Sequence, residues 1–165
     1  MIILGIDPGY AIVGWGVIEK QKNGKCAVLD YGAINTTKDT PFPERLYQIK
    51  KGAESLLGVF KPDVVAIEEL FFNTNITTAI KVAQARGLII ETAFENKVDV
   101  YEYTPLQIKQ ALTGYGRAEK KQIQYMTKTM LNLKSIPKPD DTADALAVAL
   151  THAQTNNTLN SNLMR

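Results

Sequence analysis

The spacing of the apolar residues changes along this chain, and that change constrains the fold more than any other feature. Residues 2–6, 11–18 and 26–34 are three largely apolar, strand-like runs. Asn23-Gly24 joins the last two, and this dipeptide is a strong signal for a β-hairpin. The first part of the chain is therefore expected to form an antiparallel meander.

Beyond this meander, helical and strand-like segments alternate. Apolar residues recur at helical spacing over 46–60 before a stop at Lys61-Pro62-Asp63, and a short buried strand is expected over 64–67. Another strand is expected over 99–103, and Thr104-Pro105 has the cap arrangement that begins a helix. Three helices are expected at the end of the chain, over 105–114, 118–133 and 140–152.

A long helix is expected between the last two strands, capped near Thr74 or Asn75. Its apolar stripe comprises Ile76, Ile80, Ala83, Gly87, Ile90 and Phe94. Together these elements predict an α/β fold with a mixed five-stranded sheet and helices on both faces.

Composition bounds the class of protein. With 165 residues, 45% of them hydrophobic, one domain with a real core is expected over 1–154, followed by a polar, disordered tail over 155–165. The single Cys26 excludes an intramolecular disulfide. The first apolar run is too short for a secretion signal and no run is long enough to span a membrane, so we expect a cytoplasmic protein.

Positive charge gathers between residues 105 and 140, although the net charge of the chain is only +2. This segment could face phosphates or could simply be the solvated surface of two helices. Its positive residues are Lys109, Arg117, Lys120, Lys121, Lys128, Lys134 and Lys138.

Carboxylates stand where apolar runs stop. Asp7 ends the first run and either Glu68 or Glu69 ends the run at 64–67. Asp7-Pro8-Gly9 could be no more than a turn, but the carboxyl ends of strands are also where open α/β sheets bind ligands. One of the two glutamates should be merely solvated, because alternate strand residues point to opposite faces.

A second acidic group opens the last predicted helix. Capping could explain all of it, and Asp140 is expected to be the N-cap. Asp141 and Asp144 are three residues apart on one helical face, with roughly 5–6 Å between their Cβ atoms. Small alanines along this helix would let it approach the sheet closely and bring this pair to the strand ends.

Carboxylates gathered at one point repel each other unless a hard cation lies between them. Oxygen ligands without paired Cys or His favour magnesium or manganese over zinc. His152, the only histidine, is expected to be a surface or packing residue, and Cys26 a core residue. With neither a nucleophilic triad nor a Walker loop, the residues favour metal-activated water and a nuclease.

The chain resembles the RuvC family of Holliday-junction resolvases, which belong to the RNase H-like superfamily. The likeness runs from Ile3 to about Thr151. Its landmarks are Ile-Leu-Gly-Ile-Asp-Pro-Gly at 3–9, Ala-Ile-Glu-Glu-Leu-Phe at 66–71, Gln-Ala-Arg-Gly at 84–87, Ala-Glu-Lys at 118–120 and Asp-Thr-Ala-Asp-Ala-Leu-Ala at 141–147.

The resemblance implies that Asp7, Glu68, Asp141 and Asp144 bind two magnesium ions per subunit, with manganese as a substitute, and cut DNA. It also implies that Phe71 wedges into the junction, although Phe72 is an alternative, and that Lys109 and Lys120 approach the phosphates. Arg117 and Lys121 of the basic segment are further candidate DNA contacts.

The same resemblance implies a homodimer, with the predicted helix at 75–94 as interface, that makes paired symmetric nicks in four-way junction DNA. The implied partners are the RuvA and RuvB branch-migration proteins, in recombination and repair. Two other classes share some features: an ATP-binding fold of the actin and heat-shock-chaperone kind, which needs two such domains, and a non-catalytic junction-binding protein.

Overall fold

The computed structural model describes residues 1–70, 76–155 and 162–164. The strands are β1 (Ile2–Asp7), β2 (Ile12–Lys20), β3 (Cys26–Asn35), β4 (Val64–Glu68) and β5 (Asp99–Tyr103). The helices are α1 (Phe42–Phe60), α2 (Ile76–Glu95), α3 (Pro105–Thr113), α4 (Lys120–Met130) and α5 (Asp140–Gln154). Among the described residues no helix is long and apolar enough to cross a membrane.

The strands form one mixed sheet in the order β3-β2-β1-β4-β5. β1, β2 and β3 are antiparallel neighbours, and β1, β4 and β5 run parallel. The hairpin between β2 and β3 turns at Gly24, whose φ of 80° suits glycine. The predicted mixed five-stranded sheet is therefore confirmed.

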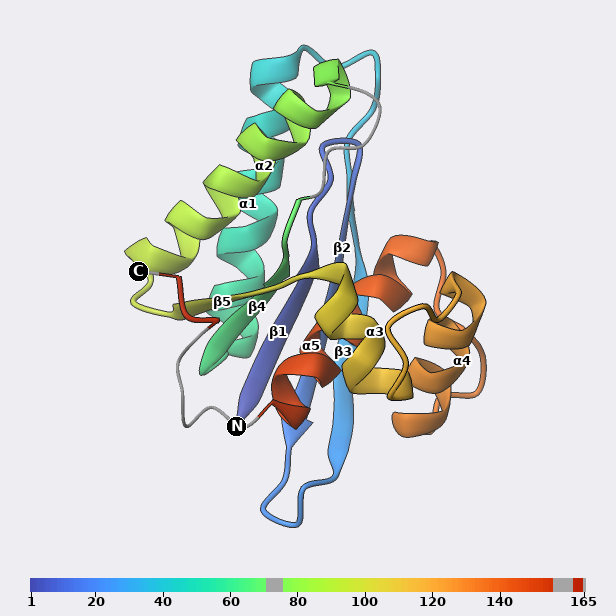
Figure 1. Ribbon diagram of the computed structural model, residues 1–165. Coiled ribbons are helices and arrows are strands. Elements are labelled where there is room, and N and C mark those ends of the chain that lie inside the picture. Colours follow the sequence, from blue (N-terminus) through green and yellow to red (C-terminus); the bar gives the residue numbers. More distant parts are fainter. Residues whose placement is uncertain (71–75, 156–161, 165) are drawn as a thin grey trace.

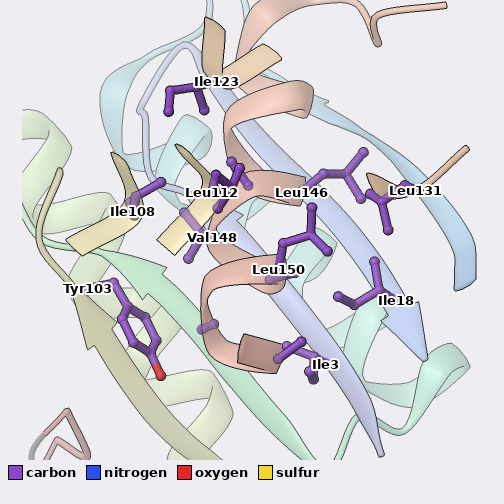
Figure 2. Close-up of a cluster of buried hydrophobic side chains, with 14 of the residues drawn as sticks. Ile3, Ile18, Tyr103, Ile108, Leu112, Ile123, Leu131, Leu146, Val148 and Leu150 are labelled. Atoms are coloured by element: carbon purple, nitrogen blue, oxygen red, sulfur yellow. The ribbon is translucent and has the colours of Figure 1, made fainter. Parts of the chain in front are cut away.

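Helices cover both faces of the sheet (Figure 1). α1 and α2 pack on one face, around a core that includes Leu4, Val17, Ile49 and Ile89. α5 lies on the other face, with α3 and α4 outside it, so it is buried on almost every side. Figure 2 shows Leu146, Val148 and Leu150 of α5 among core side chains from the sheet and the outer helices.

Local signals explain both ends of α3 and the start of α4. Thr104 caps α3 with a reciprocal pair of hydrogen bonds to Gln107, and the helix ends at Gly114 in the left-handed region, as predicted. α4 is shorter than its predicted span of 118–133: a capping box of Glu119 and Gln122 begins it at Lys120, and it ends at Met130, just before Asn132 with a φ of 52°. The N-cap of α5 is Pro139 and not Asp140, which is the first residue of the helix.

Much of the apolar stripe predicted for α2 is exposed: Ile80 and Phe94 are 56% and 80% exposed, although Ile90 packs against the core. The buried residues of α2 include Ala85, Ile89 and Ala93. α2 therefore has apolar residues on two faces, with small residues on the face toward the sheet. The predicted cap at Thr74 or Asn75 lies outside the described residues.

One further prediction needs correction, and one of two predicted alternatives is confirmed. Asn162–Met164 of the predicted disordered tail pair with the edge of β5: the amide of Glu102 donates to the Asn162 carbonyl at 2.8 Å and that of Met164 to the Val100 carbonyl at 2.9 Å. His152 is fully buried, so only the packing alternative holds; its Nδ1 lies 2.7 Å from the hydroxyl of Tyr103.

Candidate active site

Asp7 and Glu68 end two neighbouring parallel strands. Ile6 of β1 is in register with Ile67 of β4, so the next residue on each strand is one of these carboxylates. Because carboxyl ends of parallel strands meet at one edge of a sheet, both side chains belong to the same end of the molecule. The predicted position of Asp7 at the carboxyl end of a strand is confirmed.

Glycines let α5 approach this edge. A Cβ atom on Gly14, the partner of Asp7 on β2, would lie 2.0 Å from the carbonyl oxygen of Asp141. A Cβ atom on Gly5 would lie 2.1 Å from the carbonyl oxygen of Ala145. Both distances are far below any real contact, so only glycine permits this approach. The first turns of α5, with Asp141 and Asp144, consequently lie against β2 and β1, beside the end of β1 at Asp7.

The carboxylates act on one another through space. Burial, followed by the negative charges of Glu68, Asp144 and Asp141, raises the pKa of Asp7 to about 8. Burial and the charge of Asp144 raise the pKa of Glu68 to about 7. Burial also raises the pKa of Asp144, against the opposing effect of Lys120. Burial and the mutual repulsion of the carboxylates therefore both disfavour the charged forms at this site.

Lys120 supplies positive charge at this site. Its Nζ lies 2.7 Å from Oδ2 of Asp144 and 3.9 Å from Oδ2 of Asp140. Asp140 also pairs with Lys138 at 2.5 Å, which lowers its pKa. Asp140 is thus engaged with two lysines at the rim.

An open pocket of about 210 Å³ lies beside the carboxylates. Glu68, Asp144, Lys109 and Lys120 line it, together with apolar residues of α3, α4 and α5. The structure thus brings two of the predicted DNA contacts, Lys109 and Lys120, to the carboxylates. A pocket with carboxylates on one wall and ammonium groups on another can take both a divalent cation and a phosphate.

The other predicted DNA contacts lie elsewhere. Arg117 is exposed between α3 and α4, and Lys121 is exposed at the start of α4, where it lines a separate groove with Tyr125 and Met126. Phe71 and Phe72 lie outside the described residues.

The donor set, which consists of carboxylate oxygens, fits a hard cation. Within residues 1–70, 76–155 and 162–164, no three acidic, His or Cys side chains form a metal-binding cluster. Asp144 is paired with Lys120. Burial and neighbouring carboxylates raise the pKa of Asp7 and of Glu68, so a positive charge at this point would favour their charged forms.

Sequence reasoning missed a buried arginine behind Asp7. Arg45 of α1 is only 7% exposed, and it donates to Oγ1 of Thr36 at 2.8 Å and to the carbonyl of Tyr10 at 3.1 Å. Its guanidinium also lies 4.3 Å from the centre of the Tyr10 ring. Arg45 thereby holds the segment that follows Asp7. Helical spacing from Arg45 to the core residue Ile49 was the signal that could have revealed it.

Comparisons with known proteins agree with this geometry. The family model described as "Crossover junction endodeoxyribonuclease RuvC" matches residues 3–152. A protein of that name from Brevibacillus brevis is 58% identical to this chain, and the match covers 93% of this chain and 92% of the relative. One from Alkaliphilus metalliredigens is 57% identical, and the match covers 93% of each chain.

Among solved structures, one titled "T. thermophilus RuvC in complex with Holliday junction substrate" superposes with a TM-score of 0.89. It is 41% identical, and the match covers 93% of each chain. Such identity over nearly the full length establishes the family as well as the RNase H-like fold. The chain belongs to the RuvC family of crossover junction endodeoxyribonucleases.

Proposed function

We propose that this protein resolves four-way DNA junctions by metal-dependent phosphodiester hydrolysis, with Asp7, Glu68, Asp141 and Asp144 as its metal-binding carboxylates. The observation that carries the proposal is geometric: Asp7 and Glu68 end neighbouring parallel strands, and the first turns of α5 pack closely beside them. Burial and the other three carboxylates raise the pKa of Asp7 to about 8. A protein gains nothing in stability from this repulsion, so a ligand-binding role explains why the charges are gathered.

Magnesium is the proposed metal, with two ions per subunit and manganese as a substitute. All-carboxylate donors suit these hard cations. The bound metal would lower the pKa of a water molecule and stabilise the charge that develops on the phosphate. The carboxylates hold it at the strand ends, and the Lys120 ammonium, 2.7 Å from Asp144, lies ready to contact a phosphate oxygen.

Lys109 and Lys120 are the proposed phosphate contacts nearest the scissile bond, because both line the pocket that Glu68 and Asp144 also line. Arg117 and Lys121, exposed farther along the same segment, would contact the DNA backbone beyond it. Phe71 is the proposed wedge at the crossover. These contacts together would bind the junction mainly by charge and shape.

A homodimer is proposed through α2, as paired symmetric nicks require two active sites. Ile80, Ala83, Gly87 and Phe94 are exposed on one face of this helix. An exposed apolar stripe of this kind is typical of a protein interface. RuvA and RuvB are the proposed partners in branch migration, in recombination and repair, and the cytoplasm is the proposed location.

Amide substitutions test the active site. Asp7→Asn, Glu68→Gln, Asp141→Asn and Asp144→Asn should each abolish cleavage of a four-way junction in magnesium but leave junction binding in EDTA within a few-fold of the parent. Binding depends on phosphate contacts, whereas these residues hold metal. Glu69→Gln is the matched control and should cleave normally. Full activity in any amide variant of the four would remove that residue from the site.

A further inference from the structure

Arg86 reaches from the middle of α2 to the backbone of Glu68. Its Nε donates a hydrogen bond to the Glu68 carbonyl oxygen at 3.3 Å, and its terminal nitrogen forms an ion pair with Glu102 of β5. The Arg86 side chain is only 13% exposed, and its neighbour Ala85 is fully buried against the sheet. Arg86 is therefore fixed at its base by packing and at its tip by two acceptors.

The peptide group that follows Glu68 is held at both ends. Its N–H, which belongs to Glu69, donates to the carbonyl of Tyr103 on β5 at 2.9 Å. Its carbonyl oxygen, which belongs to Glu68, accepts from Arg86. Because a peptide group is planar, fixing both ends fixes the backbone torsion next to the Glu68 side chain.

This second bond comes at a point where the β-ladder stops. The N–H of this peptide faces β5, so its carbonyl is directed away from β5 and toward β1, and the pairing of β1 with β4 ends at Ile6 and Ile67. The carbonyl of Glu68 therefore lies beyond the last residue pair on that side. At a strand end, a change in backbone torsion moves the side chain with it. A carboxylate that binds metal must keep its position closely, so such movement would weaken metal binding. The hydrogen bond from Arg86 of α2 to the Glu68 carbonyl thus stabilises the orientation of the Glu68 side chain relative to the sheet.

We propose that Arg86 is a positioning residue, which sets the direction of the metal-binding Glu68 carboxylate through the Glu68 carbonyl. The inference rests on the proposed role of Glu68. Glu102 balances the charge of Arg86, so the guanidinium acts here as a hydrogen-bond donor to the backbone more than as a free charge. A lysine has one ammonium where arginine has a planar fork, and it would not serve both acceptors with the same geometry.

Metal binding without DNA tests this proposal directly. The probe is Mn²⁺ alone, titrated into the full chain and followed by electron paramagnetic resonance. Arg86→Ala should weaken Mn²⁺ binding by roughly 10- to 100-fold, the range that loss of a residue orienting a ligand produces. Arg86→Lys should give a smaller loss. In junction cleavage, both variants should need more Mn²⁺ for half-maximal rate yet approach the parental rate at saturation.

Two control variants separate positioning from general weakening of α2. Lys50→Ala removes the ion pairs from α1 to Glu91 and Glu95 of α2, at 3.1 and 3.2 Å, without touching the site. Glu102→Gln keeps an acceptor for Arg86 and leaves the Glu68 contact in place. Both should bind Mn²⁺ within about twofold of the parent.

Parental Mn²⁺ binding in a folded Arg86→Ala variant would overturn the proposal. If Arg86→Ala does not fold, Arg86→Lys is tested in its place, and Mn²⁺ binding equal to that of the parent in this variant would also overturn the proposal. Equal losses in Lys50→Ala and Arg86→Ala would also overturn it, since general destabilisation would then account for both. Glu68→Gln is titrated in parallel, and parental Mn²⁺ binding and cleavage in it would instead show that Glu68 is not a ligand, a failure of the proposed function itself.

Discussion

Nζ of Lys120 lies 2.7 Å from Oδ2 of Asp144, so a lysine at the start of α4 neutralises part of the carboxylate group on α5. The Lys120 side chain is 55% exposed, and an ion pair with such access to water contributes little stability. Breaking this ion pair therefore costs little free energy. A cation bound to Asp144, as proposed above, would free Lys120 for a phosphate in the same pocket.

The neighbouring lysines of α4 should therefore differ in effect. Lys120→Ala is expected to lower the cleavage rate at saturating junction and magnesium by at least about tenfold, since a charge beside the reacting phosphate is lost. Lys121→Ala, a change of equal charge one residue away, should cleave at nearly the parental rate. Each substitution that removes a phosphate contact should also lower the slope of log affinity against log salt by roughly 0.9. Single-turnover cleavage and a salt titration measure these effects, and equal rates in the two variants would contradict the assignment.

The raised pKa of Asp7 predicts how stability depends on pH without metal. Its carboxyl has a folded-state pKa of about 8 against an ordinary value of 3.8, so the folded protein holds a proton that the unfolded chain releases. The contribution of Asp7 to stability is then fully present below its ordinary pKa of 3.8 and is lost as pH rises toward about 8, by up to about 1.4 kcal/mol per pH unit for one proton. Glu68 adds to this slope, as its pKa is raised to about 7.

Asp7→Asn removes this titration and should flatten the profile. In EDTA the variant should melt above the parent at pH 8, by roughly 2–4 °C for each 1 kcal/mol, and close to it near pH 4. Thermal unfolding across this pH range measures the difference. Parallel profiles for the two proteins would show that Asp7 titrates normally.

Much of the fold could be predicted from local patterns. Asn23-Gly24 gave the hairpin and Thr104-Pro105 gave the start of α3, because both signals act within a few residues. The stripe of α2 could not be oriented in the same way. Ile80 and Phe94 lie on a regular apolar face that is exposed, whereas the face with Ala85 and Ala93 packs against the sheet. A single sequence does not show which of two apolar faces packs inside the subunit and which is left for the proposed dimer interface.

In the candidate site too, features set by local sequence could be predicted, whereas contacts between residues far apart in sequence could not. Asp7 at a strand end and Asp141 with Asp144 on one helical face follow from period and spacing. The contacts of Arg45 and Arg86 with the backbone do not, because each joins residues far apart in sequence through a carbonyl that leaves no trace in side-chain patterns. Such contacts become visible only when α1 and α2 are placed against the strand ends.

The close approach of α5 to the sheet predicts that Gly14 is indispensable. Gly14→Ala would place a methyl group 2.0 Å from the carbonyl oxygen of Asp141, a backbone atom that cannot turn away. We expect a loss of about 1–3 kcal/mol in the free energy of unfolding, together with loss of cleavage as α5 shifts. Gly58→Ala on α1 is the control, because nothing lies within 4 Å of its Cβ. It should be neutral or gain up to about 1 kcal/mol. Urea unfolding and junction cleavage provide the measurements, and a fully active, stable Gly14→Ala would contradict the packing argument.

Phe94 tests the proposed dimer. It is 80% exposed on α2, so Phe94→Asp should leave the free energy of unfolding of one subunit nearly unchanged. A buried charge in an apolar interface is costly, so the dimer dissociation constant should rise at least about tenfold. Sedimentation equilibrium measures it, and paired nicks should decline relative to single nicks on a junction. Tyr125→Asp, on an exposed ring of α4, should leave the dimer intact; a dimer of parental affinity in Phe94→Asp would place the interface elsewhere.

Phe71 lies outside the described residues, and its proposed role as the junction wedge makes a prediction that separates it from a core residue. A ring that stacks on bases contributes roughly 1–3 kcal/mol per base to binding, whereas truncating a core Phe costs roughly 3–5 kcal/mol of stability. Phe71→Ala should accordingly melt within a few degrees of the parent and cleave junctions poorly. Phe60→Ala provides the contrast, because Phe60 packs against the core and its ring centre lies 5.9 Å from that of Trp15. It should lower the melting temperature much more than Phe71→Ala does. A large fall in the melting temperature of Phe71→Ala, or normal cleavage by that variant, would assign the wedge to another residue, with Phe72 the first to be tested.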